Sequence, residues 1–259
     1  MQNHKSLDID QIKESTGCST IHYFESLNST NSWLLEHGEC GDICISESQT
    51  IGRGRRGNSW VSPHGNIYFS LCWCFDEIVE HWSFLGLVTG IAIAEALQDI
   101  GLTNHGVKWP NDIFWQQKKL GGILLETVDQ SGKVIIGIGL NITLPTDSSK
   151  TIGQPVTSLA EAMNDKVSRD ELVAQLIIRL KEKLNGFKWL NFDQFMQSWQ
   201  TWDILRGEQV YFDHQGIAVS GEVVEIDKHG RLGILKNTGE LCFYSSADIR
   251  LKSLNRNSA

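Results

Sequence analysis

The stretch that decides the fold is Gly52-Arg53-Gly54-Arg55-Arg56-Gly57, in a chain of 259 residues with a formal net charge of −8. Glycine permits positive φ angles and a close approach of the backbone to a ligand. Arginine supplies planar, permanently charged donors that suit phosphate and carboxylate groups. The stretch therefore predicts a loop that binds an anionic ligand. The alternatives are a solvated basic loop and a nucleic-acid patch.

The residues after Gly57 exclude the two common phosphate-binding folds. The spacing fits G-x-G-x-x-G, but that motif needs a helix directly after its last glycine. Here a turn with Pro63 and Gly65 follows, and residues 67–73 are rich in β-forming side chains that predict a strand. A P-loop is excluded as well, because position 58 is Asn where that motif has Lys, and the helix is again missing.

Composition places the chain among ordinary globular proteins. Hydrophobic residues make up 41% and charged residues 21%, and the length allows one large domain or a large and a small one. The pI of about 5.5 argues against broad nucleic-acid binding. The N-terminus starts no secretory signal, and the most apolar stretch, 84–97, is too short to span a bilayer. We expect a cytoplasmic protein that binds neither nucleic acid nor membrane.

The cysteines predict free thiols. There are six, and none forms a C-x-x-C pair or a paired cluster that would indicate zinc. We expect buried or half-buried free thiols in a reducing compartment. The residues are Cys18, Cys40, Cys44, Cys72, Cys74 and Cys242.

Hydrophobic periodicity predicts a mixed sheet flanked by helices, an α+β fold. Expected strands are 43–47, 67–75, 123–126 and 134–140, with an extended 107–109 held by Pro110. Expected helices are 81–100, in which Gly86 and Gly90 allow close packing, 168–186 behind a capping box at Ser168, and 191–202.

From Gly207 onward the pattern changes to short strands and turns. The expected strands are 210–212, 217–219, 221–224, 232–235 and 241–243, with turns at 216, 228–230 and 237–239. About 50 residues of this kind predict a small β-barrel. We therefore divide the chain into a catalytic domain, 1–205, and a C-terminal barrel domain, 206–259.

Three further segments carry candidate functional residues. In Lys108-Trp109-Pro110-Asn111-Asp112 a rigid, extended backbone suits a positioned cation, although an edge-strand lysine is usually solvated. Gly121 and Gly122 stand at the mouth of a buried strand, which indicates either backbone pressed against a ligand or a bulge. Asn141, near the end of a second buried strand, could pair with an adenine edge or cap a turn.

Taken together, these segments resemble the biotin protein ligase family. The resemblance is strong from Ser29 to Asn141, and five motifs occur in the family's order. It implies a mixed sheet flanked by helices, with a small SH3-like barrel at the C-terminus. The segments that carry it are 28–31, Gln49, 52–57 with Trp60, 108–112, 119–124 and 139–141.

The resemblance implies a two-step reaction. Family members join biotin to ATP, giving biotinyl-5′-AMP and pyrophosphate, and then pass biotin to a lysine of the biotin carboxyl carrier domain of acetyl-CoA carboxylase or a related carboxylase. Biotin, ATP and Mg²⁺ are the implied ligands, with Mg²⁺ arriving on ATP rather than in a tight protein site. Relatives also pair through sheet edges, which implies a homodimer.

The resemblance also implies a role for each matched residue. Lys108 and Arg55 are the expected catalytic residues. The expected biotin-binding residues are Ser29, Thr30, Asn31, Gln49, Arg53, Gly54, Arg55, Trp60, Lys108, Gly121 and Gly122. The expected ATP and adenylate-binding residues are Arg55, Arg56, Lys108, Asn111, Asn141 and Arg250.

The sequence departs from the pattern of the biotin protein ligase family at two points, and three rival functions remain open. Asn58 stands where many family members have a basic residue, which predicts weaker adenylate retention. About 20 polar residues precede the first ligase motif, which predicts a ligase without a DNA-binding repressor domain. The rivals are a lipoate ligase or octanoyl transferase, a nucleic-acid-binding module with salt-sensitive binding, and an inactive scaffold.

Overall fold

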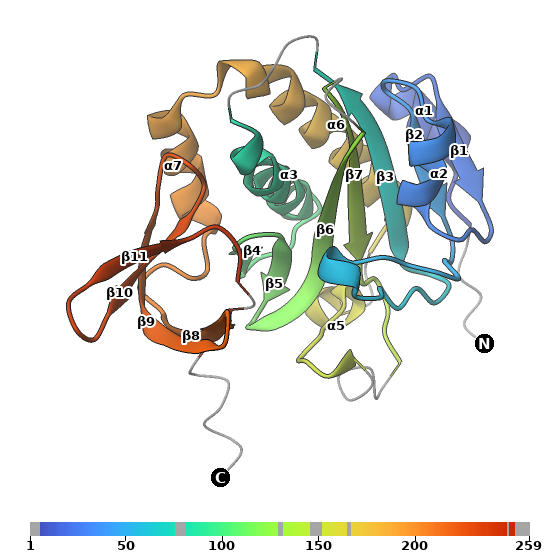
Figure 1. Ribbon diagram of the computed structural model, residues 1–259. Coiled ribbons are helices and arrows are strands. Elements are labelled where there is room, and N and C mark those ends of the chain that lie inside the picture. Colours follow the sequence, from blue (N-terminus) through green and yellow to red (C-terminus); the bar gives the residue numbers. More distant parts are fainter. Residues whose placement is uncertain are drawn as a thin grey trace.

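The central element is a seven-stranded mixed sheet in the order β1-β2-β3-β7-β6-β5-β4 (Figure 1). The computed structural model describes residues 6–75, 81–128, 132–145, 152–164, 167–247 and 249–251. β1 and β2 pair in parallel, and every other pair in this sheet is antiparallel. The strands are β1 (Ile21–Phe24), β2 (Ile43–Ser46), β3 (Ile67–Cys74), β4 (His105–Lys108), β5 (Asp112–Trp115), β6 (Lys118–Val128) and β7 (Lys133–Leu140).

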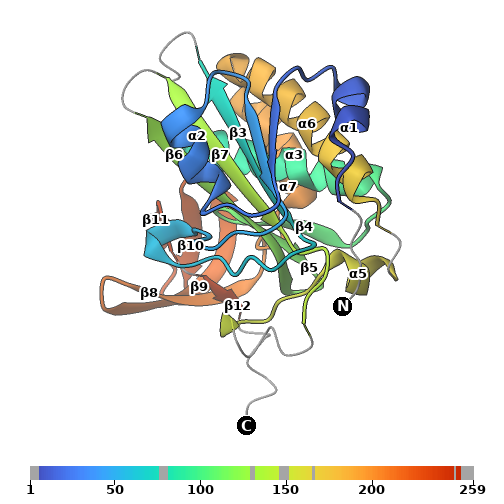
Figure 2. The ribbon, with the colours of Figure 1, turned by 90° about the vertical axis from the view of Figure 1, so that its right-hand side faces the viewer.

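Helices cover both faces of this sheet. The helices are α1 (Ile9–Thr16), α2 (Thr30–His37), α3 (Leu85–Asp99), α5 (Leu159–Met163), α6 (Arg169–Gly186) and α7 (Phe192–Trp202), with 3₁₀ turns η1 (Arg55–Gly57), η2 (Trp82–Phe84) and η3 (Phe187–Trp189). In Figure 2, α2 lies on the opposite side of the sheet from α1, α3 and α6. The predicted cap is confirmed, since Ser168 Oγ accepts from the Glu171 amide at 3.2 Å.

Strand alternation separates the two faces. A Cβ added to Gly90 of α3 would lie 2.8 Å from Val107, so this glycine lets α3 press onto β4. Ile123 of β6 contacts the same helix, whereas a Cβ added to Gly137 of β7 would lie 2.1 Å from Asn31 of α2. Because successive side chains of a strand point to opposite faces, β6 and β7 present one face to α3 and the other to α2.

The C-terminal residues form a second, antiparallel sheet in the order β11-β10-β9-β8-β12. The two strands expected at 217–219 and 221–224 are a single strand, β9, because the ladder runs unbroken through Gly221. The fold class is confirmed, and this sheet is consistent with the expected small barrel. The domain boundary at 205 stays a prediction. The strands are β8 (Gln209–His214), β9 (Ile217–Ile226), β10 (Leu232–Lys236), β11 (Leu241–Tyr244) and β12 (Arg250–Leu251).

The free-thiol prediction is wrong for two cysteines. Cys40 and Cys74 form a disulfide with their Cα atoms 5.6 Å apart. The bond forms because the turn before β2 folds back on β3, where the Gly41 amide donates to the Cys72 carbonyl at 2.8 Å. Cys44 and Cys72 are buried free thiols, and burial raises the pKa of Cys44 to about 12. Sequence periodicity also missed α1 and α2, which are each only 8 residues long.

Within the described residues, no helix is long and apolar enough to cross a membrane.

Candidate active site

A cavity opens on the α2 face of the large sheet. Its walls are the N-terminus of α2, the Gly52–Gly57 loop with Trp60, the turn between β4 and β5, and the facing strands β6 and β7. The lining residues are Ser29, Thr30, Asn31, Gln49, Arg53, Gly54, Arg55, Trp60, Tyr68, Asn111, Asp112, Lys119, Gly122, Ile123, Leu124, Gly137, Ile138 and Gly139.

One end of the cavity is built from neutral hydrogen-bonding groups. Ser29 caps α2, its Oγ accepting from the Ser32 amide at 3.4 Å. Gln49 Oε1 accepts from the Thr30 amide at 2.9 Å and its Nε2 donates to Ser62 at 3.0 Å. These bonds fix the Gln49 amide and the α2 N-terminus relative to each other. The end of the cavity is therefore a rigid array of donors and acceptors.

A second network ties Arg53 to the same end. Asn31 Oδ1 lies 2.6 Å from the Ser70 hydroxyl, and Asn31 Nδ2 donates to Glu126 at 2.9 Å. Arg53 Nη2 in turn lies 2.6 Å from the other oxygen of Glu126. Glu126, which the sequence analysis missed, therefore orients both the α2 amide and the first arginine of the loop.

Three glycines flatten the strand surface that floors the cavity. A Cβ at Gly139 would lie 2.6 Å from the Trp60 ring, and one at Gly137 would lie 2.1 Å from Asn31. Gly122 also faces Trp60, at 3.2 Å. A Cβ at Gly121 would point to the other face, 2.4 Å from Leu140, and Gly121 does not line the cavity, so its contact with biotin stays a prediction. Strand alternation separates the two neighbouring glycines.

Trp60 lies flat over these glycines. Its Nε1 is buried and, among the described residues, has no hydrogen-bond partner. A buried donor that lacks a partner costs free energy, and a ligand acceptor in the cavity would relieve that cost. Lys119 Nζ lies 5.3 Å from the centre of the indole ring.

The other end of the cavity carries positive charge. Arg55 Nη1 donates to Asn111 Oδ1 at 2.9 Å, and Asn111 Nδ2 donates to the Ile123 carbonyl at 2.9 Å. Burial lowers the pKa of Arg55, and neighbouring Arg56 lowers it further, while Asp112 opposes the shift. Lys119 Nζ lies 2.8 Å from Asp112 Oδ1. Three cations and one carboxylate thus line the cavity of an acidic protein, which favours an anionic ligand.

The structure brings Lys119, rather than Lys108, to the cavity. Lys108 is the last residue of β4, and its Nζ lies 4.8 Å from the centre of the Phe114 ring. Lys119 was overlooked because Lys118 and Lys119 stand side by side in sequence. Their alternation along β6 turns Lys118 to Glu161, at 2.7 Å, and Lys119 into the cavity.

Three predicted ATP-binding residues also lie outside the lining. Arg56, at φ 56°, hydrogen-bonds Ser246 in the connection that follows β11. Asn141 Nδ2 donates to the Thr157 carbonyl at 3.0 Å, so it holds the segment before α5, which is the turn-capping alternative. Arg250 is exposed on β12. The other predicted residues of the α2 N-terminus, the loop and the β4–β5 turn are brought together as expected.

Asn58 has a structural role in the loop. Its carbonyl accepts from the Gly54 amide at 2.7 Å, and its amide donates to the Arg55 carbonyl at 3.1 Å. These bonds close the tip of the loop through backbone atoms, which any residue at position 58 can supply.

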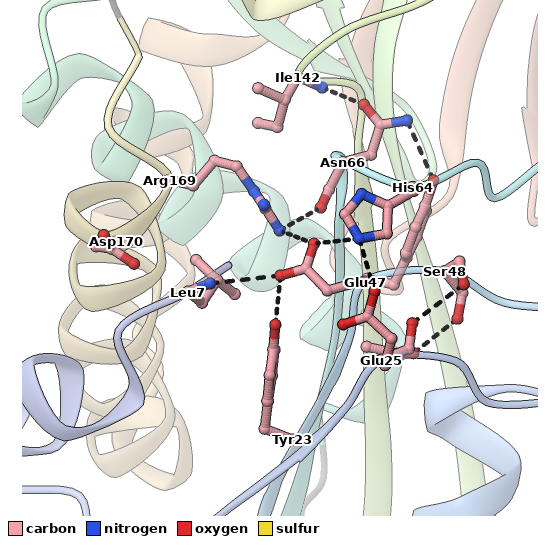
Figure 3. Close-up of polar contacts among 12 residues, drawn as sticks. Leu7, Tyr23, Glu25, Glu47, Ser48, His64, Asn66, Ile142, Arg169 and Asp170 are labelled. Atoms are coloured by element: carbon pink, nitrogen blue, oxygen red, sulfur yellow. Dashed lines mark hydrogen bonds and ion pairs between the residues drawn. The ribbon is translucent and has the colours of Figure 1, made fainter. Parts of the chain in front are cut away.

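A buried ion pair supports the cavity from behind (Figure 3). Glu47 is fully buried and its Oε2 accepts from Arg169 Nη2 at 2.7 Å, while its Oε1 accepts from the Tyr23 hydroxyl at 2.7 Å. Burial and the bond to Glu47 raise the pKa of Tyr23 to about 12. Arg169 also donates to the Asn66 carbonyl at 3.1 Å, and Asn66 donates to Tyr68, which lines the cavity.

The sequence of this chain is similar to those of a known family and of several characterised ligases. The biotin/lipoate A/B protein ligase family matches residues 23–142. The bifunctional ligase/repressor BirA of Escherichia coli is 33% identical over 254 residues, which cover 95% of this chain and 78% of that protein. The biotin–[acetyl-CoA-carboxylase] ligase of Mycobacterium tuberculosis is 27% identical over 259 residues, covering 95% of this chain and 94% of that one.

A solved structure agrees with these sequence matches. The biotin protein ligase of Aquifex aeolicus, in complex with biotin and ATP, superposes with a TM-score of 0.79 at 30% identity, covering 90% of this chain and 99% of that one. The chain therefore belongs to the biotin/lipoate A/B protein ligase family. Within that family, these similarities place it among the biotin protein ligases.

Proposed function

We propose that this chain joins biotin to ATP, forming biotinyl-5′-AMP and pyrophosphate, and then transfers biotin to a lysine of a carboxylase carrier domain. The observation that carries the proposal is the polarity of one cavity, which has neutral amides and hydroxyls at the α2 end, where Arg53 is paired with Glu126, and the cations Arg55 and Lys119 at the other end. A ligand with a neutral polar ring system and a negatively charged tail fits this arrangement. The similarity to ligases named for biotin supports the same assignment.

The α2 end of the cavity would hold the biotin rings. The backbone and side chains of Ser29, Thr30 and Gln49 supply donors and acceptors for a ureido group. Trp60 and the glycine floor supply a flat apolar surface. This placement directs the valeryl carboxylate toward Arg55 and Lys119.

The cationic end would carry the first chemical step. A biotin carboxylate oxygen attacks the α-phosphorus of ATP, and the bond to the pyrophosphate oxygen breaks. Two anions approach each other in this step, so cations near the α-phosphate stabilise the transition state. Lys119 and Arg55, which line the cavity, would supply these cations, and we assign to Lys119 the catalytic role that the sequence had suggested for Lys108.

Asp112 fits a Mg²⁺ ion that arrives with ATP. Asp112 is the one carboxylate among the residues that line the cavity, and Mg²⁺ is commonly held by one or two carboxylates plus substrate phosphates. When bound, the ion would neutralise phosphate charge, and Asp112 would hold it.

The second step needs no protein nucleophile. The carrier lysine, as the neutral amine, attacks the acyl carbon of the adenylate, AMP leaves with the bonding electron pair, and the nitrogen releases a proton to solvent to give the amide. The same cations that favour the first step stabilise the phosphate as it leaves. The acceptor is a carrier domain of acetyl-CoA carboxylase or a related carboxylase, and the cytoplasm is the proposed location of the reaction.

Pairing of two copies through a sheet edge also belongs to this proposal. The large sheet ends at β1 and at β4. The outer edge of β4 is occupied in part, because Val107 accepts a hydrogen bond from the Ile204 amide at 3.2 Å. β1 is therefore the edge that we propose for a homodimer.

Biotin-dependent ATP–pyrophosphate exchange tests the assignment of the lysines. Losing a hydrogen bond to a charged group costs about 1.5–3 kcal/mol, so Lys119→Ala should slow exchange by about ten- to a hundredfold. Lys108→Ala is the matched control and should retain most of the activity. The reverse ranking would restore Lys108 as the catalytic lysine.

The same assay tests the substrate. Exchange with lipoate but not with biotin would move the chain to the lipoate branch of its family. Absence of exchange with either acid would contradict the ligase proposal.

A further inference from the structure

The C-terminal sheet reaches the cavity walls at two separate points. The turn between β9 and β10 contacts Trp109, which stands next to the β4–β5 turn that carries Asn111 and Asp112. The connection after β11 contacts Arg56 in the Gly52–Gly57 loop. Neither contact touches the ligand cavity itself.

The first contact is buried and specific. Trp109 Nε1 donates to the Gly230 carbonyl at 3.0 Å, and the Trp109 side chain is 2% exposed. Gly230 adopts φ +73° and its Cα hydrogens face Ser83, so the turn seats closely against η2. A substituted residue there would be strained and crowded.

The turn that presents Gly230 is braced by Asp227. Its Oδ1 accepts from the amides of His229 and Arg231, both at 2.9 Å, and its Oδ2 accepts from Arg231 Nε at 2.7 Å. Burial raises the pKa of Asp227, but the bonds from Arg231 and the backbone outweigh it and lower the pKa. The carboxylate therefore holds the Gly230 carbonyl in a fixed position for Trp109.

The second contact ties down the loop. Arg56 hydrogen-bonds Ser246, while the preceding residue, Arg55, donates to Asn111. Adjacent arginines thus connect the loop to the β4–β5 turn and to the C-terminal sheet. Together with the bond between Trp109 and Gly230, these contacts join the C-terminal residues to both the loop and the β4–β5 turn.

We propose that the C-terminal sheet positions the active site, with Ser246 holding the Gly52–Gly57 loop closed through Arg56 and the Asp227–Arg231 turn seating the Asn111–Asp112 segment through Trp109. Ser246 and Trp109 are positioning residues, because they act through Arg56 and the β4–β5 turn. A closed loop keeps water from a reactive adenylate and slows its escape. The inference rests on the proposed function, since it assigns how that site retains its intermediate.

The test for Ser246 is the rate at which labelled biotinyl-adenylate leaves the enzyme. Ser246→Ala removes one solvent-exposed hydrogen bond, so escape should be about twofold to tenfold faster. Ser246→Thr, which keeps the hydroxyl, should restore the wild-type rate, and the neighbouring, exposed Ser245→Ala is the matched control. An unchanged escape rate in Ser246→Ala would overturn the loop contact.

A double-mutant comparison separates positioning from general destabilisation. If Ser246 acts through Arg56, the double variant with Arg56→Ala should release adenylate no faster than Arg56→Ala alone. Additive effects would overturn the coupling. Thermal melting temperatures of the single variants should match wild type.

Trp109→Phe tests the second contact, because it keeps an aromatic ring and removes the N–H donor. We expect kcat for exchange to fall by about tenfold while KM for biotin stays near wild type. Equal kcat in a folded variant would overturn the role of Trp109, and the Ser246 series decides independently if Trp109→Phe does not fold. Wild-type enzyme without any biotin-dependent exchange would instead contradict the proposed function.

Discussion

At the scale of single residues, the site depends on glycines, which have no Cβ atom. Gly137 and Gly139 lie on the cavity face of β7, two positions apart, and leave room for Asn31 and Trp60. Any Cβ at either position would occupy space that those side chains fill. The flat floor of the cavity therefore follows from strand periodicity combined with glycine at the right positions.

The variant Gly139→Ala tests this directly. Its Cβ would lie 2.6–2.9 Å from the Trp60 ring, so the indole must shift out of the cavity floor. KM for biotin should rise about tenfold or more, equivalent to at least about 1.4 kcal/mol. The measurement is steady-state exchange at varied biotin. The control is Gly186→Ala at the end of α6, where an added Cβ would have no neighbour within 4 Å, and this variant should match wild type. A normal KM for biotin in Gly139→Ala would contradict the packing of Trp60 on Gly139.

At the scale of elements, one buried ion pair joins segments that are far apart in sequence. Glu47 follows β2 and Arg169 begins α6, while Tyr23 of β1 and the Leu7 amide also bond to Glu47 (Figure 3). The side chains of Glu47 and Arg169 are 0% and 9% exposed. A buried charge that loses its partner is costly, so this pair holds the N-terminal segment, two strands and a helix in register.

We expect Arg169→Met to lower the free energy of unfolding by about 3–5 kcal/mol, because Glu47 stays buried without its main partner. Urea unfolding followed by circular dichroism measures the change. The exposed pair Lys118–Glu161 is the comparison, and Lys118→Met should cost no more than about 1 kcal/mol. Similar losses in both variants would show that burial does not set the strength of the Glu47 contact.

The disulfide is a second link between elements. It joins the turn before β2 to the end of β3, with 34 residues of sequence separation. In the chain-entropy description, a crosslink over this length contributes about 3–4 kcal/mol. Reduction of the wild type should lower the urea midpoint to that of the Cys40→Ser/Cys74→Ser double variant, which reductant should not affect. Wild-type stability that does not respond to reductant would contradict this contribution.

At the scale of the whole molecule, the cavity is assembled from segments between Ser29 and Gly139 and is braced by the C-terminal sheet. A ligand that bridges these walls binds only the folded chain. Binding to the folded state alone stabilises it by mass action.

We therefore expect biotin to raise the thermal unfolding midpoint. At a concentration one hundred times Kd the stabilisation is about 2.7 kcal/mol, which corresponds to a shift of roughly 5–10 °C for a chain of this size. Scanning calorimetry with biotin, with lipoate and with neither acid makes the measurement. A shift with lipoate and none with biotin would contradict the assigned substrate.

Much of the fold could be predicted because its elements are locally encoded. β3, β7, α3 and α6 carry long apolar patterns, and Ser168 caps α6 as its position predicts. α1 and α2 escaped prediction because 8 residues give little periodicity, and Asp8 and Ser29 start them through caps. Gly221 resembled a break in the sequence, yet pairing on both sides keeps β9 continuous.

The site was predicted at the level of segments and only in part at the level of side chains. From the sequence alone, residue chemistry determined that the glycine- and arginine-rich loop binds an anion, and the order of motifs, through the family resemblance, implied that this loop shares one site with residues 28–31 and 108–112. The tertiary structure decided which lysine enters the cavity, which glycine faces it and where Arg56 and Asn141 point. Those outcomes depend on strand register and on contacts between distant segments, since a shift of one residue along a strand turns a side chain to the opposite face.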